Sequence, residues 1–173
     1  PSSSFSDQCQ NCPIGRYLTD AATSAGEHDA QTDCLRCVAG KQFKDGVSLC
    51  GICAAGKYQD KNDAAPAVCL YCAPGLYLTD AALDGSEHND ASKCLACPIG
   101  YKSLDTRARC EICGFSKYQD EEGGNNCKVC PANSFITDDK QEFINHDAYA
   151  DCVNCTSGQF AKHGLEEIAR YCD

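Results

Sequence analysis

One segment occurs twice with few changes, as CPIGRYLTDAATSAGEHDAQTDCLRC at residues 12–37 and as CAPGLYLTDAALDGSEHNDASKCLAC at residues 72–97. A more diverged third copy, CPANSFITDDKQEFINHDAYADCVNC, covers residues 130–155. Self-similarity at a fixed period is the signature of a repeat architecture. Each copy begins and ends in a CxxC pair, so the fold depends on how these cysteines are joined.

The CxxC pairs extend through the whole chain. Eight of them begin at residues 9, 34, 50, 69, 94, 110, 127 and 152, and Cys172 stands alone near the end. The pattern recurs after 60 residues and then after 58. We therefore expect the end of a preceding repeat at residues 1–8, full repeats at 9–68 and 69–126, and a truncated repeat at 127–173.

The composition leaves little material for a hydrophobic core. The 173 residues include 17 cysteines but only 8 Tyr, 6 Phe, no Met and no Trp. This cysteine density is typical of disulfide scaffolds in oxidising compartments, so we expect an extracellular or cell-surface location. The predicted fold is small and disulfide-rich: an elongated rod of tandem cysteine-rich modules with short β-hairpins, little helix and no single hydrophobic core.

Charge and motifs restrict the function. A net charge of −10 disfavours binding to nucleic acid or to an anionic membrane surface, and no apolar stretch is long enough to insert into a membrane. No nucleophile–base constellation, phosphate loop or paired-carboxylate cleft is recognisable, so we expect no enzyme and no cofactor. The sequon Asn154-Cys155-Thr156 makes Asn154 a candidate glycosylation acceptor, and glycans a further partner.

Two regular disulfide patterns fit the spacing, and the spacing alone does not decide between them. An interlocked pattern would close Cys9–Cys34 and Cys12–Cys37, continue in the same way, and leave Cys172 over. A ladder would leave Cys9 over and would contain the bonds Cys12–Cys34, Cys37–Cys50, Cys53–Cys69, Cys72–Cys94, Cys97–Cys110, Cys113–Cys127, Cys130–Cys152 and Cys155–Cys172. Because PSSSF at residues 1–5 resembles PANSF after Cys130, we expect a cysteine before Pro1 as the ladder partner of Cys9.

A finer pattern follows each CxxC pair. A turn former stands three residues after the second cysteine, at Gly15, Gly40, Gly56, Gly75, Gly100, Ser116, Asn133 and Gly158. Gly and Asn adopt a positive φ at low cost, so these positions predict turns. Aromatic residues follow at Tyr17, Tyr58, Tyr77, Tyr118, Phe135 and Phe160, with Phe43 and Tyr101 shifted by one. We interpret each ring as packing on the disulfide of its own module rather than as part of a ligand-stacking face.

Three histidines recur at one place in the repeat. His28, His88 and His146 each lie six residues before a cysteine. We predict half-buried side chains that bond to loop backbone; the functional alternative is a metal ligand or a pH-sensitive contact between modules. The loop aspartates are predicted to be mostly solvated turn residues, with weak calcium binding as the alternative. Short helices are predicted at residues 140–146 and 164–171.

These motifs resemble a known family of modules. The segments CPIGRY at residues 12–17, GKYQD at 56–60 and KYQD at 117–120 are similar to the cysteine-rich repeats of tumour necrosis factor receptors, and closer to ephrin-receptor-like repeats. Such arrays also occur in large protist and algal surface proteins. In the tumour necrosis factor receptor family the stretch similar to residues 9–53 is bonded as a ladder, which implies Cys12–Cys34 and Cys37–Cys50.

The resemblance and the composition lead to one functional hypothesis. We expect a non-enzymatic extracellular structural or adhesive rod, part of a large cell-surface or filament protein that self-associates. Its partners would be other copies of itself or other surface and matrix proteins. The first alternative is a receptor ectodomain stalk that binds a protein ligand, and a weaker one is a zinc-binding CxxC array.

Overall fold

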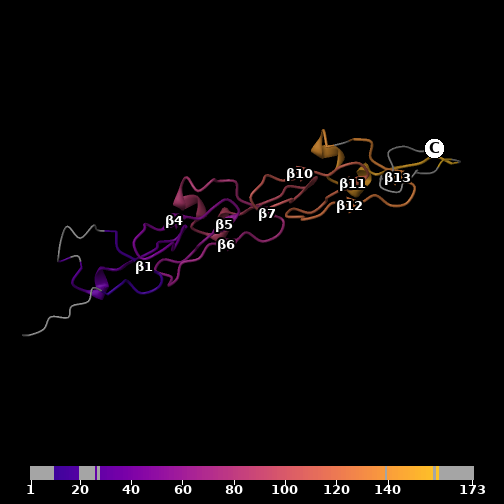
Figure 1. Cartoon of the computed structure of the whole chain (residues 1–173). Helices are drawn as coiled ribbons and strands as arrows, with labels where there is room; N and C mark the ends of the chain where they lie inside the picture. Colours follow the sequence, from indigo (N-terminus) through magenta and orange to yellow (C-terminus); the bar gives the residue numbers. More distant parts are fainter. Residues whose placement is uncertain (1–9, 20–25, 27, 139, 158, 160–173) are drawn as a thin grey trace, which may run out of the picture.

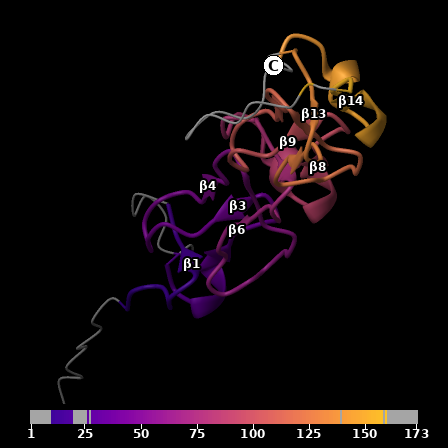
Figure 2. The same ribbon diagram turned by 90° about the vertical axis from the view of Figure 1, so that its right-hand side faces the viewer.

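The chain forms a long, narrow stack of small loops. The computed structural model describes residues 10–19, 26, 28–138, 140–157 and 159 of the 173. In Figure 1 the loops follow one another along one axis in the order of the sequence, and the view turned by 90° in Figure 2 keeps this order. The predicted disulfide-rich rod is confirmed.

Seven disulfides hold the described part of the chain. Each joins the second cysteine of one CxxC pair to the first cysteine of the next pair: Cys12–Cys34, Cys37–Cys50, Cys53–Cys69, Cys72–Cys94, Cys97–Cys110, Cys113–Cys127 and Cys130–Cys152. Residues three apart in extended backbone point to opposite faces, so the two cysteines of a pair bond in opposite directions along the stack. Cys155 is also disulfide-bonded, while Cys9 and Cys172 lie outside the described residues.

Every described loop between disulfides begins with a two-residue strand that pairs with the residues inside the next CxxC pair. The antiparallel hairpins are β1 (Arg16–Tyr17) with β2 (Leu35–Arg36), β3 (Lys41–Gln42) with β4 (Gly51–Ile52), β5 (Lys57–Tyr58) with β6 (Leu70–Tyr71), β7 (Leu76–Tyr77) with β8 (Leu95–Ala96), β9 (Tyr101–Lys102) with β10 (Glu111–Ile112), β11 (Lys117–Tyr118) with β12 (Lys128–Val129), and β13 (Ser134–Phe135) with β14 (Val153–Asn154). Such short strands cannot form an independent sheet, and the adjacent disulfides hold them in register.

The predicted turns precede the first strand of each hairpin. Positive φ angles occur at Gly15, Gly40, Gly56, Gly75, Gly100, Ser116 and Asn133. This confirms the turn at every predicted position within the described residues; Gly158 lies outside them. Ser116 is the one member that is neither Gly nor Asn, and its hydroxyl accepts a hydrogen bond from the Ile136 amide at 3.3 Å.

Within the described residues, helical structure is limited to single turns in the three long loops. The 3-10 turns are η2 (Gln31–Asp33), η3 (Gly85–His88), η4 (Ala91–Lys93), η5 (Phe143–Asn145) and η6 (Tyr149–Asp151). The predicted helix at residues 140–146 is wrong in extent, because the Asp138 carboxylate accepts the amides of Gln141 and Glu142 and Lys140 has a φ of 59°. The predicted helix at residues 164–171 lies outside the described part.

Small hydrophobic clusters replace a single core. One contains Cys72, Cys94 and Leu78, with Tyr58 packed against them. A second contains Tyr118, Cys130 and Ile136. Tyr58 and Tyr118 therefore pack on the disulfide of the following loop, which corrects the prediction that each ring covers the disulfide of its own module. The described residues contain no helix long and apolar enough to cross a membrane.

Candidate functional site

Backbone hydrogen bonds join several loops to the next one at the predicted turns. The Gly40 amide donates to the Gln59 carbonyl at 2.7 Å, and the Gly56 amide donates to the Leu78 carbonyl at 2.8 Å. The same arrangement recurs from the Gly100 amide to the Gln119 carbonyl at 2.7 Å. These bonds use backbone groups of both loops, so the contact between loops is part of the fold.

The same turns also reach the loop after the next one. A Cβ atom built on Gly15 would lie 2.9 Å from the Ala65 Cα, and one built on Gly100 would lie 2.7 Å from the Phe143 carbonyl oxygen. The Tyr101 and Phe143 rings meet across that contact, with centroids 5.9 Å apart. Each loop is therefore held by its neighbour and by its second neighbour along the rod.

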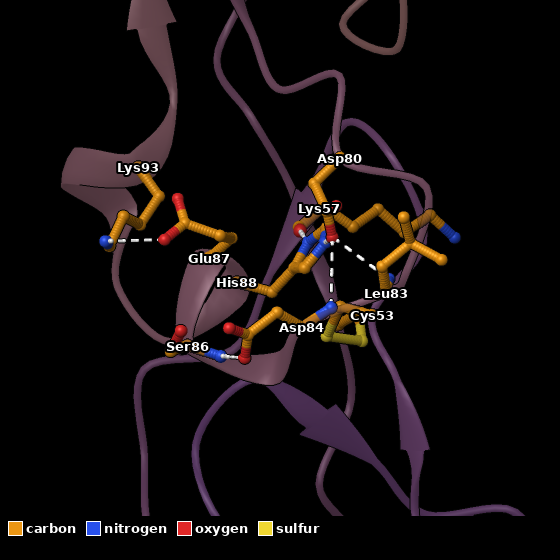
Figure 3. Close-up of polar contacts among 10 residues, drawn as sticks. Cys53, Lys57, Asp80, Leu83, Asp84, Ser86, Glu87, His88 and Lys93 are labelled. Carbon is orange, nitrogen blue, oxygen red and sulfur yellow. Dashed lines mark hydrogen bonds and ion pairs between the residues drawn. A yellow bond between two sulfur atoms is a disulfide. The ribbon is translucent and has the colours of Figure 1, made fainter.

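The largest fully buried side chains in the described residues lie at these loop contacts. His88 has no exposed surface and lies between the backbone of β5 and the Asp80 side chain (Figure 3). Its Nδ1 is 2.7 Å from the Lys57 carbonyl oxygen, and its Nε2 is 2.8 Å from Asp80 Oδ2. The Gln59 amide in turn donates to the His88 carbonyl at 2.8 Å. His88 thus links the long loop closed by Cys72–Cys94 to the loop before it.

His146 repeats this arrangement with a longer carboxylate contact. Its side chain is fully buried, its Nδ1 lies 2.7 Å from the Lys117 carbonyl oxygen, and the Gln119 amide donates to its carbonyl at 2.8 Å. Its Nε2 is 3.4 Å from Asp138 Oδ2 and makes no hydrogen bond. The prediction of a half-buried histidine on loop backbone is therefore right about the backbone partner and understates the burial.

The carboxylate partners were not recognised among the loop aspartates. Asp20, Asp80 and Asp138 each precede a recurrent histidine by eight residues, and this fixed interval is the sequence signal that could have paired them. A hydrogen bond from His88 lowers the pKa of the Asp80 carboxyl, and the amides of Leu83 and Asp84 lower it further. Asp20 lies outside the described residues, and His28 differs from the other two histidines because it is exposed.

Two buried glutamines complete the contact and were missed as well. Gln59 and Gln119 are each 3% exposed and directly follow β5 and β11. Gln59 Oε1 accepts the Lys61 amide at 2.6 Å, and its Nε2 donates to the Lys41 carbonyl at 3.3 Å. They belong to the KYQD segments that carry the family resemblance, and the interval of 60 residues between them marks them as a repeated structural feature.

Replacement of Gln59 tests this assignment. Gln59→Ala removes the partners of a backbone amide and a backbone carbonyl at a buried position, and we expect a loss of about 1 to 3 kcal/mol in local stability. Amide hydrogen exchange around Lys61, with the disulfides intact, measures this loss. Gln31→Ala, at an exposed position, is the matched control and should stay within about 0.5 kcal/mol of the parent chain. Equal behaviour of the two variants would contradict the assignment.

The other loop aspartates mostly bind backbone, as turn residues do. Asp84 and Asp90 accept the Ser86 and Ser92 amides at 2.8 Å each, and these bonds lower the pKa of both carboxyls. Asp105 is held by the Arg107 side chain, which lowers its pKa. Within the described residues no three His, Cys, Asp or Glu side chains are grouped as metal ligands.

A cavity of about 310 Å³ lies beside the second histidine site, lined by Ile136, Asp138, Asn145, Asp151 and neighbouring residues. Its position has a counterpart in each earlier long loop. There the Leu18 amide donates to the Gly46 carbonyl at 3.0 Å, and the Leu78 amide donates to the Thr106 carbonyl at 2.9 Å. In the earlier copies this position is bonded to the following loop, and we assign the cavity no ligand.

Comparison with known proteins agrees with this architecture. Residues 100–141 match the family described as "Tyrosine-protein kinase ephrin type A/B receptor-like". The protein named "Sushi, von Willebrand factor type A, EGF and pentraxin domain-containing protein 1" is 30% identical over 98 residues in both rat and mouse; the match covers 56% of this chain and 2% of that protein.

A second relative is a zebrafish protein named "Ephrin type-B receptor 4b". It is 41% identical over 51 residues, which make up 30% of this chain and 5% of that protein. The chain therefore spans a small part of the length of these relatives. Together with the seven disulfides, these matches confirm the resemblance to ephrin-receptor-like cysteine-rich repeats and an extracellular or cell-surface location.

Proposed function

We propose that this chain is a non-enzymatic structural and adhesive rod within a larger extracellular or cell-surface protein, with repeats at residues 9–68, 69–126 and 127–173 after the end of a preceding one. The observation that carries the proposal is the series of hydrogen bonds and close contacts between successive loops along one axis. Contacts to the first and second neighbour resist bending at any single junction. The chain would act as a spacer that keeps other parts of the protein apart.

Exposed apolar residues that recur at one sequence position support the adhesive part of the proposal. Leu35, Leu70, Leu95 and Val153 each follow the first cysteine of a CxxC pair and are 52%, 52%, 54% and 60% exposed. Their recurrence in the short strands presents the same apolar position several times along the rod. Such repetition favours lateral contact with a second copy of the chain. Asn154 is exposed beside Val153, which fits its proposed glycosylation.

A receptor stalk is the second candidate, because one relative is named a receptor. The stalk would use the same rod but would bind a different protein through its loops. The zinc alternative has less support, because the cysteines from Cys12 to Cys152 are joined in disulfides. Zinc binds thiolates, and a disulfide sulfur does not supply one.

Scattering and sedimentation test the two parts of the proposal. We expect small-angle scattering to give a long-tailed pair-distance distribution and a radius of gyration well above the value of about 16 Å for a compact chain of this length. Sedimentation velocity should show association that increases with concentration. A compact particle would contradict the rod.

Charged substitutions separate specific from general association. Leu70→Glu with Leu95→Glu should weaken self-association, whereas Leu83→Glu, at a position 82% exposed outside the strands, should not. A chain that stays monomeric at all concentrations would contradict self-association and would favour the receptor stalk.

A further inference from the structure

Two buried imidazoles join successive loops through groups whose charge depends on pH. The first latch consists of Asp80, His88 and the carbonyl of Lys57; the second latch consists of Asp138, His146 and the carbonyl of Lys117. In both, the histidine side chain has no exposed surface. Burying a side chain that can carry a charge is costly unless it is paired, so the protonation state of each latch affects the contact between loops.

The geometry of the first latch favours one protonation state. A backbone carbonyl only accepts hydrogen bonds, so the His88 Nδ1 at 2.7 Å from the Lys57 oxygen must carry a proton. Nε2 lies 2.8 Å from Asp80 Oδ2, which also accepts the Leu83 amide at 3.1 Å. Because Asp80 Oδ2 is surrounded by hydrogen-bond donors, it is an ionised carboxylate oxygen that only accepts. A hydrogen bond to it therefore requires a proton on Nε2. The imidazolium form of His88 is therefore the one that satisfies both contacts.

The second latch is a looser version of the first. His146 Nε2 is 3.4 Å from Asp138 Oδ2 and makes no hydrogen bond. Burial raises the pKa of the Asp138 carboxyl, but the bonds from the Glu142 amide and the Asn145 side chain outweigh it, so the pKa is lowered overall. The two latches therefore consist of the same residue types and differ in the distance between the imidazole Nε2 and the carboxylate oxygen, which provides a comparison within one chain.

The other charged groups around the first latch have partners of their own. Lys57 lies over the Tyr71 ring with its Nζ 4.4 Å from the ring centroid, and Asp84 accepts the Ser86 amide. Glu87 is 3.5 Å from Lys93 (Figure 3). From the loop closed by Cys37–Cys50, Lys41 lies beside Gly85.

Around the second latch the charged groups are Glu142, Asp147 and the pair formed by Lys140 with Glu111. None of these other groups pairs with the imidazole nitrogens in either latch.

We propose that the two latches are pH-sensitive couplings, which hold the second and third long loops on the preceding strand only while the aspartate is ionised. On the acid side the sign follows from Asp80: its pKa lies below the ordinary 3.8. It therefore contributes stability above that value, and the contribution is lost as the pH falls through the folded-state pKa. The contact between these loops is thus firm above this pH range and looser below it.

Amide hydrogen exchange of the full chain with intact disulfides tests the proposal directly. The probe is the Gln59 amide, which donates to the His88 carbonyl, and the reference is the Phe43 amide, which donates to the Ala67 carbonyl at 2.9 Å across a loop contact without a histidine. After correction for intrinsic exchange, we expect the Gln59 protection to fall about tenfold as the pH falls through the folded-state pKa of Asp80. The reference should not show this profile. Gln119, at the looser latch, should show a smaller fall.

Asp80→Asn distinguishes a pH-sensitive coupling from a merely structural contact. The amide cannot ionise, so the acid-side fall of the Gln59 protection should disappear, while Asp29→Asn at an exposed position should leave it unchanged. A flat Gln59 profile, or an unchanged acid-side fall in Asp80→Asn, would overturn the proposal. If Asp80→Asn does not fold, the comparison of Gln59 with Phe43 in the parent chain still decides. The rod itself is tested separately by scattering, so the two proposals can fail independently.

Discussion

Gly75→Ala should lower the free energy of local opening in the middle of the rod by about 3 kcal/mol. Amide protection there should fall on the order of 100-fold. Gly75 has a φ of +85°, which costs an alanine about 1 to 2 kcal/mol. The added Cβ would also overlap the carbonyl oxygen of Gly123, which belongs to the loop after the next one. That oxygen is part of the backbone and cannot move aside as a side chain could. Exchange of the Cys97 amide, which donates to the Gly75 carbonyl at 3.0 Å, measures the effect.

Substitutions at two other glycines distinguish backbone strain from the steric overlap as the cause of the lost stability. Gly123→Ala has the same strain, with a φ of +72°, but its Cβ would meet only the Ala96 Cβ at 4.0 Å. Gly46→Ala has no neighbouring atom within 4 Å and no positive φ. We expect the largest loss for Gly75→Ala, an intermediate loss for Gly123→Ala and almost none for Gly46→Ala. Equal losses for Gly75→Ala and Gly123→Ala would contradict the close contact between second neighbours.

The local geometry of the loops was largely predictable from the sequence. The turn three residues after each CxxC pair follows from Gly and Asn preferences, and it is found at Gly75 and Asn133. The short strands follow from the same spacing. The two residues between the cysteines of a CxxC motif form one strand, which bonds to the strand after the turn. The turn and the strand of each loop lie within a few residues of a CxxC pair, so the local sequence is enough to predict them.

Contacts between loops were much harder to predict. Tyr58 packs on the disulfide of the following loop because its strand leads toward that loop, and nothing in the spacing of the rings specifies this direction. The spacing of the cysteines does not pair Asp80 with His88, since a carboxylate in a loop has no periodic neighbour that would identify its partner. Their pairing depends on the path of the chain between them. The interval of eight residues between aspartate and histidine is present in the sequence. It identifies a pair only when the histidine is known to be buried.

Stability in this chain is distributed along the rod rather than concentrated in a core. Each loop is closed by one disulfide and contacts its first and second neighbours, as in other repeat proteins, where stability is a sum of local terms and interface terms. The disulfide Cys53–Cys69 lies in the middle of this arrangement, and Cys53 has no exposed surface. Its loop supplies the Gly56 turn to the next loop and the Gln59 carbonyl to the previous one. Opening this loop therefore weakens its hydrogen bonds to the previous loop and to the next loop.

Cys53→Ala with Cys69→Ala should lower stability by about 3 kcal/mol, the value that the chain-entropy model gives for a loop of this length. Because both neighbours lose an interface, we expect the Gly40 amide of the previous loop and the Leu78 amide of the next loop to exchange on the order of 100-fold faster. Val47→Ala with Leu49→Ala changes the same number of residues at positions 77% and 66% exposed, and it should alter exchange little. If the double cysteine variant changed exchange only inside its own loop, the loops would be independent units and the stacking argument would be wrong. If the change spreads to both sides, the contacts between loops make the disulfide ladder a single stiff body.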